Sequence, residues 1–211
     1  MTGRMAETLL RWTLNGEKQP ALLCSAGDEA ALLTGLLITG RRADRIDGIR
    51  QEPDGWQVRA QTRPARDLAA RLEELPPLAS PLTAEKAELN ALHREAMAWR
   101  RESGQHIALL ASGGRRAAGL DIGRHNALDK AVGLALAQGM SLDRAALFTS
   151  GRLSAELLAK AAAAGIPILC SAKQAGSLCI AYAEKLNMAL YQPGPEGETF
   201  GAAWRIKECK L

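Results

Sequence analysis

The sequence lacks any segment that could cross a membrane. A spanning helix needs about 20 consecutive apolar residues, whereas the longest mainly apolar run, residues 30–39, is short and interrupted by Thr34 and Gly35. The first eleven residues carry three charged side chains, where a secretory signal would have its apolar core. We therefore expect a cytoplasmic protein that has no membrane partner.

The sequence also lacks paired cysteines. Its four cysteines are Cys24, Cys170, Cys179 and Cys209. No two of them are spaced as C-x-x-C, which excludes a zinc ribbon and a dithiol redox site. Cys170 and Cys179 stand in apolar surroundings, which predicts reduced and buried thiols.

Zinc-dependent deaminase chemistry is excluded for a related reason. It requires an H-x-E motif and a P-C-x-x-C motif to hold the metal and activate water. The second residue after His106 is Ala108, and the second after His125 is Ala127, so neither histidine begins such a motif. We therefore assign no metal ligand.

The composition is that of a folded protein. Hydrophobic residues make up 47% and charged residues 24% of the 211 residues, close to the globular average, which excludes wholesale disorder. The net charge of +4 is too small to indicate a nucleic-acid partner. Arginine outnumbers lysine by 19 to 8, and arginine is the better bidentate clamp for phosphate.

Residues 1–78 are expected to form a small β-rich α+β module. Strands are expected over residues 7–14, 20–24, 46–50 and 56–62, and helices over residues 29–38 and 64–75. The dipeptide Asn15-Gly16 is a hairpin signal between the first two strands. Asp28 is expected to cap the first helix and Gly40 to end it, while Pro64 begins the second helix.

Residues 79–211 are expected to form an α/β domain, separated from the first module by the prolines of residues 76–81. Strands are expected over residues 106–111, 117–122, 145–149, 166–171 and 188–191, and helices over residues 84–101, 127–138, 154–164 and 176–186. Short apolar strands that alternate with helices imply parallel crossovers. The sequence therefore predicts a three-layer α/β/α fold.

Three turns of this domain follow strand ends and are rich in polar and small residues. They are residues 121–130, 149–156 and 171–178. Ligands of such sheets bind beyond the carboxyl ends of the strands, where helix N-termini favour anions. Arg124, Arg152 and Lys173 add full positive charges there, and Asn126 and Ser154 are expected to be N-caps. The turns predict a pocket for a phosphorylated ligand, and the alternative is that they are only well-capped loops.

The same turns carry a resemblance to a known family. The run D-I-G-R-H-N-A-L-D-K at Asp121–Lys130, the segment S-G-R-L-S-A-E at Ser150–Glu156 and the tripeptide Gly165-Ile-Pro closely resemble the FdhD/NarQ family of formate dehydrogenase accessory proteins. Looser matches occur at residues 15–16, 27–28, 33–37, 103–106 and 177–178. The resemblance covers nearly the whole chain.

The resemblance implies a function and a site. Members of this family carry sulfur from a cysteine desulfurase to the molybdenum centre of formate dehydrogenase, and they bind the bis-molybdopterin guanine dinucleotide cofactor. Their larger domain looks like the cytidine-deaminase fold, and they act as dimers. We therefore expect the formate dehydrogenase catalytic subunit and a cysteine desulfurase as partners. The residues expected to bind the cofactor are Gly123, Arg124, His125, Asn126, Lys130, Ser150, Gly151, Arg152, Ser154, Ser177 and Gly197.

The sequence departs from the family pattern in three places. The family's sulfur-relay C-x-x-C would fall at about residues 62–64, where cysteine is absent and the loop is shortened. A persulfide needs an accessible thiolate, and Cys24 is the partial substitute. In the family's cofactor segment after the last strand only Gly197 matches, and an acidic residue before the D-x-G-R-H-N motif is replaced by Leu120.

Three functions remain open. The first is a cofactor-binding maturation factor without the usual relay cysteines. The second is a sulfurtransferase that uses Cys24 or a partner's thiol, and the third is a non-catalytic paralogue that binds a protein partner. No catalytic residue is assigned. A homodimer is also expected from the helix over residues 29–38, because its four leucines offer more apolar surface than one face can hide.

Overall fold

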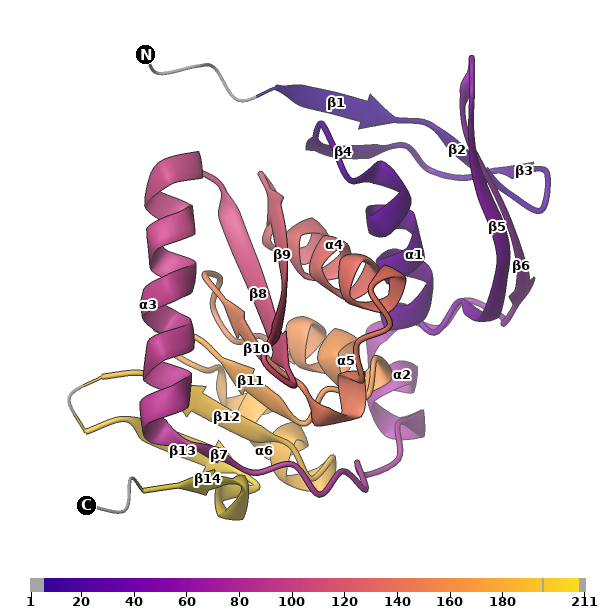
Figure 1. Cartoon of the computed structure of the whole chain (residues 1–211). Coiled ribbons are helices and arrows are strands. Elements are labelled where there is room, and N and C mark those ends of the chain that lie inside the picture. Colours follow the sequence, from indigo (N-terminus) through magenta and orange to yellow (C-terminus); the bar gives the residue numbers. More distant parts are fainter. Residues whose placement is uncertain (1–5, 195, 209–211) are drawn as a thin grey trace.

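The computed structural model describes residues 6–194 and 196–208, and its N-terminal part contains two small sheets and two helices (Figure 1). Strands β1 (Glu7–Leu10) and β4 (Leu22–Ser25) form an antiparallel ribbon. A four-stranded sheet has the order β3-β2-β6-β5, with β2 (Trp12–Leu14), β3 (Glu17–Lys18), β5 (Ala43–Glu52) and β6 (Gly55–Thr62). Helix α1 (Glu29–Thr39) packs beneath these strands, and α2 (Leu68–Glu74) follows them.

The local signals of this part are partly confirmed. Asn15 and Gly16 both have positive φ, 51° and 87°, as a tight hairpin turn requires. Asp28 does precede α1, but its side chain accepts no capping hydrogen bond. Helix α1 ends at Thr39 with Gly40 as its C-cap, as expected, and the left-handed conformation falls on the next residue, Arg41. The second helix begins at Leu68, four residues later than expected from Pro64, because Asp67 Oδ1 accepts a hydrogen bond from Ala70 N at 2.8 Å.

The second part is built on a six-stranded sheet in the order β13-β12-β11-β10-β8-β9. Its strands are β8 (His106–Ser112), β9 (Arg115–Asp121), β10 (Ala146–Thr149), β11 (Ile168–Cys170), β12 (Ala189–Gln192) and β13 (Glu198–Gly201). The helices are α3 (Lys86–Ser103), α4 (Arg124–Ala137), α5 (Ala155–Ala163) and α6 (Ser177–Lys185). Two-residue strands β7 (Ala84–Glu85) and β14 (Ile206–Lys207) pair beside them.

The helices cover both faces of this sheet, so the three-layer α/β/α architecture is confirmed (Figure 1). Alternate residues of the strands point to opposite faces: Leu147 and Leu169 pack under α4–α6, whereas Phe148 and Cys170 pack under α3. The predicted parallel pairs β10–β11 and β11–β12 are present. The edge strand β13, antiparallel to β12, is an element that the sequence pattern did not predict.

Helices α1 and α4 join the two parts at very close range. A Cβ atom built on Gly35 would lie 1.8 Å from the carbonyl oxygen of Asp129, and one on Gly133 would lie 2.0 Å from the carbonyl oxygen of Ala31. Only glycine permits such a backbone approach. Leu32, Leu33 and Leu37 are fully buried within the chain. The argument for a homodimer from this helix is therefore wrong, because the chain itself buries three of its four leucines and packs against the half-buried fourth, Leu36.

Among residues 6–194 and 196–208, none of the helices combines the length and the apolar character needed to cross a bilayer.

Candidate functional site

The three turns singled out in the sequence meet at one edge of the six-stranded sheet. Strand β8 is antiparallel to both β9 and β10, so β9 and β10 run in the same direction, and β11 is parallel to β10. The carboxyl ends of β9, β10 and β11 therefore share an edge. Because β8 lies between β9 and β10, its first residue, His106, enters the same edge.

Arg124 and the Ser150–Arg152 turn are in direct contact at this edge. A Cβ atom on Gly151 would lie 2.7 Å from Cδ and 3.1 Å from Cβ of Arg124, so the arginine side chain lies across the glycine. Arg124 Nε is buried and has no hydrogen-bond partner. Such a donor carries a desolvation cost of about 1–3 kcal/mol unless it is satisfied. A ligand oxygen would satisfy it once the side chain turned outward, since Nε is closed to solvent in this structure.

The start of α5 supplies the other half of this arrangement. Ser154 Oγ accepts a hydrogen bond from Leu157 N at 3.4 Å, which confirms that Ser154 is the N-cap. Arg152 is exposed beside it. The first N–H groups of a helix have no partner within the helix and carry partial positive charge. Two arginines and two helix starts, those of α4 and α5, are therefore close to one another here.

Two histidines line the same edge. His125 Nε2 lies 3.3 Å from Glu156 Oε2, and burial lowers the pKa of His125 although Glu156 opposes this effect. His106 Nδ1 lies 3.1 Å from Ser150 Oγ, which also accepts a hydrogen bond from Ile107 N. Burial, followed by the charges of Arg100 and Arg124, lowers the pKa of His106. Sequence reasoning missed His106 because nothing local shows that β8 begins among the other turns.

Lys130 is buried away from this edge, contrary to the expectation that it binds the cofactor, and the half-buried Asn126 uses its amide nitrogen within the chain. Lys130 is 1% exposed, with its Nζ 3.0 Å from Asp121 Oδ2 and donating to the carbonyl oxygen of Ser25 at 2.8 Å. Asn126 Nδ2 donates to the Leu23 carbonyl oxygen and to Asp121 Oδ1. Asn126 is also not the N-cap of α4, since that position is Gly123.

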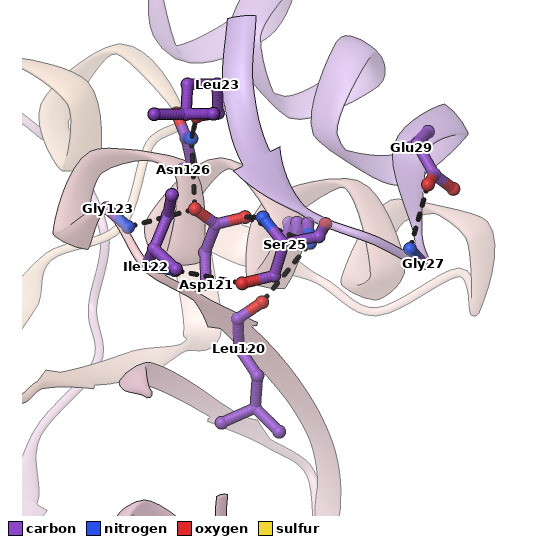
Figure 2. Close-up of polar contacts among 10 residues, drawn as sticks. Leu23, Ser25, Gly27, Glu29, Leu120, Asp121, Ile122, Gly123 and Asn126 are labelled. Carbon is purple, nitrogen blue, oxygen red and sulfur yellow. Dashed lines mark hydrogen bonds and ion pairs between the residues drawn. The ribbon is translucent and has the colours of Figure 1, made fainter. Parts of the chain in front are cut away.

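These contacts form a buried network around Asp121 (Figure 2). Asp121 accepts hydrogen bonds from the backbone N–H of Ser25 at 3.0 Å and of Gly123 at 2.9 Å. Ser25 Oγ accepts another from Ile122 N at 3.1 Å. The network fastens β4 to the turn that carries Arg124. The buried Asp121 and Lys130 therefore position the site rather than line it, and Asn126 helps to hold the turn.

A second buried pair fixes the far side of α4. Lys160 Nζ lies 2.6 Å from Asp129 Oδ2, and Thr39 Oγ1 donates to Asp129 Oδ1 at 2.6 Å. Helices α1, α4 and α5 are thereby tied together by one carboxylate. The last two residues of the D-I-G-R-H-N-A-L-D-K run thus hold the fold.

Ser177 and Gly197 lie further along the sheet. Ser177 is the exposed first residue of α6, and its turn is held to the β10–α5 turn by a hydrogen bond from Gly176 N to the Leu153 carbonyl oxygen. Gly197 has φ 61°, and a Cβ atom there would lie 2.4 Å from the Tyr191 hydroxyl oxygen. Close packing within the chain is sufficient to explain glycine at this position.

The described thiols are all buried. Cys24, Cys170 and Cys179 are each 0% exposed, and Cys209 lies outside the described residues. Burial raises the pKa of Cys24 to about 11, with a smaller contribution from Asp121, and raises the pKa of Cys179 to about 12 and that of Cys170 further. The described part of the chain thus has no accessible thiolate, and it holds no cluster of His, Cys, Asp and Glu suited to a metal ion.

The fold is that of a three-layer α/β/α protein, because a mixed six-stranded sheet lies between two helical layers. Turns that carry arginine lie at the carboxyl edge of this sheet. The model of the FdhD/NarQ family matches residues 66–192, which is more than half of the chain. The chain belongs to the FdhD/NarQ family.

Individual relatives agree with this assignment. A protein named "Sulfur carrier protein FdhD" from Anaeromyxobacter sp. (strain K) is 38% identical over 135 residues, which are 58% of this chain and 46% of the relative. One of the same name from Thermoplasma volcanium is 47% identical over 70 residues, 33% of this chain and 25% of the relative. The matches thus span between a quarter and about half of these relatives.

A solved structure resembles the chain more completely. It is described as that of a candidate formate dehydrogenase accessory protein from Desulfotalea psychrophila. It has a TM-score of 0.83 and 28% sequence identity, and the match covers 96% of this chain and 90% of that one. The likeness therefore extends over both parts of the fold.

Proposed function

We propose that this protein assists the maturation of a molybdenum-dependent formate dehydrogenase by holding the bis-molybdopterin guanine dinucleotide cofactor as cargo. The observation that carries the proposal is the unsatisfied, buried Arg124 Nε, which lies against the Ser150–Arg152 turn. A guanine dinucleotide is rich in phosphate, and phosphate oxygens are the natural acceptors for such a donor. When bound, the cofactor supplies the molybdenum centre that the client enzyme uses.

In this proposal the residues of the site divide into two groups. Arg124 and Arg152 hold phosphate oxygens, assisted by the first N–H groups of α4 and α5. Gly123 and Gly151 allow close approach, while His125, Ser150, Ser154 and Ser177 complete the rim. Lys130 and Asn126 support the turn from inside.

Sulfur transfer is the second candidate, because the matched relatives are named sulfur carriers. It would require a thiolate that the described residues do not present, since their three thiols are buried with raised pKa values. The thiol that carries the sulfur would therefore have to belong to the partner desulfurase or be that of Cys209. Labelled cysteine supplied with a desulfurase tests this candidate: we expect little stable persulfide on the wild type. Strong labelling that a Cys24→Ala or Cys209→Ala variant abolishes would establish sulfur transfer instead.

The partners follow from the same proposal. The client is the catalytic subunit of a formate dehydrogenase, and a homodimer stays a prediction that light scattering can test. The exposed pair Leu9 and Leu23, directly opposite each other on β1 and β4, offers an apolar contact for a second copy.

Cofactor loading tests the proposal directly. The protein is incubated without oxygen with an extract that contains molybdenum cofactor, repurified, and assayed for released guanine nucleotide. We expect the wild type and an Arg144→Gln control, altered at an exposed position before β10, to retain nucleotide, and an Arg124→Gln/Arg152→Gln variant to lose it. Equal retention by all three proteins, or none by the wild type, would contradict the proposal.

A further inference from the structure

A basic pocket lies beside the C-terminal end of α1, between the residues that follow this helix and α2. Its volume is about 370 Å³, and its charged lining consists of Arg41, Arg63, Arg66, Arg71, Asp44 and Glu74. Four arginines face two carboxylates, so the lining has a formal charge of +2. The pocket shares no residue with the turns at the carboxyl edge, although Arg71 lies within electrostatic range of Glu156 in the first turn of α5.

Arg41 occupies this pocket at a conformational cost. Its φ is 50°, and it is the left-handed residue that ends α1, with Arg41 N bonded to the Ile38 carbonyl oxygen and Arg42 N to that of Leu37. Glycine is the usual residue at this position, and only asparagine and aspartate otherwise adopt it routinely. The other non-glycine residues of positive φ in the described chain are Asn15, Asp28 and Asn187. The arginine side chain lines the pocket, where its Nη1 donates to the Glu74 carbonyl oxygen at 3.3 Å.

Arg71 provides an independent observation. Its Nη2 donates to the Thr39 carbonyl oxygen at 2.7 Å, which fixes the guanidinium, yet its Nε is buried without a hydrogen-bond partner. The guanidinium thus lines the pocket and keeps one unused donor, although Nε itself is closed to solvent in this structure. Burial lowers the pKa of Arg71, because desolvation disfavours the charged form.

The two remaining arginines are only partly neutralised. Arg63 pairs with Asp44, and Arg66 Nε lies 3.3 Å from Glu74 Oε1. All four of these side chains are about half exposed, so the pairs are weak and their remaining guanidinium N–H groups can be directed to a ligand.

An apolar hollow adjoins the basic pocket. Its volume is about 390 Å³, and it shares Arg41, Asp44 and Arg63 with the basic pocket. The rest of its lining is largely apolar, from Ile38, Leu75, Leu78 and the end of α5. A ligand that spans both would therefore place an anionic end among arginines and an organic group against aliphatic side chains.

We propose that this double pocket binds a small phosphate monoester, with the phosphate dianion among Arg41, Arg63, Arg66 and Arg71 and an apolar organic group in the adjoining hollow. The formal charge of the lining matches that of the dianion, and arginine forks match its oxygens. This site lies beyond the proposed cofactor site and does not depend on it.

Calorimetry with phenyl phosphate and inorganic phosphate, at pH 8 and constant ionic strength, tests the proposal. The measurements use an Arg152→Gln background, so that the carboxyl edge is weakened in every sample. We expect one phenyl phosphate per chain, bound several-fold more tightly than inorganic phosphate because the ring occupies the apolar hollow. Arg63→Gln and Arg41→Gly should each weaken binding about tenfold or more, while the exposed Arg59→Gln control on β6 should not.

Arg41→Gly also separates loss of the ligand from loss of the fold. Glycine accepts φ near 50° without strain, so the melting temperature of the ligand-free variant should not fall. Equal affinities for phenyl phosphate in the Arg41→Gly, Arg63→Gln and Arg59→Gln proteins would overturn the proposal, as would absence of saturable binding. Equal affinities for phenyl phosphate and inorganic phosphate would refute the part assigned to the apolar hollow.

Discussion

Arg124 lies across Gly151, so closely that a Cβ atom on the glycine would come within 2.7 Å of Arg124 Cδ. The contact joins the first turn of α4 to the turn before α5, although the two strands that lead into them are separated by β8. Glycine at position 151 thus determines where the guanidinium of residue 124 can lie. Two motifs whose residues 124 and 151 are 27 positions apart in sequence are therefore in direct contact.

A methyl group at position 151 should therefore impair binding more than stability. In Gly151→Ala the Arg124 side chain must move, which is cheap because it is flexible, but its Nε leaves its present place. We expect the affinity for guanosine diphosphate to fall several-fold while the free energy of unfolding changes by less than about 1 kcal/mol. Gly176→Ala is the matched control, because its Cβ would have only one neighbour, at 3.9 Å. Unchanged affinity in Gly151→Ala would contradict this role.

The α1–α4 contact predicts the opposite result. Gly35→Ala and Gly133→Ala would each drive a methyl group into a backbone carbonyl oxygen of the facing helix. We expect each change to lower the free energy of unfolding by about 1–3 kcal/mol or more, measured by chemical denaturation. Gly48→Ala on β5, where a Cβ would meet nothing within 4 Å, should be neutral or nearly so. Neutral behaviour of Gly35→Ala would mean that the helices can separate freely.

Lys130→Met tests whether the buried lysine supports the fold or binds a ligand. Removing one member of a buried pair leaves Asp121 uncompensated, so we expect a loss of about 3–5 kcal/mol in unfolding free energy. Lys173→Met, at an exposed position, should cost little. If Lys130→Met were as stable as the wild type but failed to bind guanosine diphosphate, the lysine would belong to the ligand site after all.

The buried thiols predict a loss of stability in alkali. A raised pKa in the folded state means that the folded protein holds its thiol protons more tightly than the unfolded chain does. Their contribution is therefore complete below about pH 9, the usual thiol pKa, and is lost as the pH rises towards about 11. Unfolding free energies measured from pH 8 to 11 should fall, and Cys24→Ala should reduce the slope. A slope that Cys24→Ala leaves unchanged would show that this thiol ionises freely.

Patterning alone was sufficient for the second part of the fold except the edge strand β13. Alternation of apolar strands and helices predicted the three layers. The N-cap position of Ser154 was also predicted correctly, because the capping hydrogen bond from Leu157 N to Ser154 Oγ is local and needs no distant partner. The left-handed conformation of Arg41 after α1 was not predictable, since the neighbouring Gly40 could have taken it instead.

The site was less predictable because its charged residues look alike in sequence. Lys130 and Arg124 stand in the same motif, but Lys130 turns inward to the carbonyl oxygen of Ser25, more than one hundred residues earlier. Such a contact depends on how β4 meets β9, which no local pattern records. His106 joined the site for the same reason, through strand order.

Titration of guanosine diphosphate, a stand-in for the nucleotide arm of the cofactor, tests the central claim most directly. Charge-assisted hydrogen bonds contribute roughly 1.5–3 kcal/mol each, and about 1.4 kcal/mol corresponds to a tenfold change in affinity. We predict that calorimetry finds saturable binding to the wild type, weakened about tenfold or more in Arg124→Gln and in Arg152→Gln and unchanged in Arg144→Gln. Equal affinities in all four proteins would show that these turns are only capped loops.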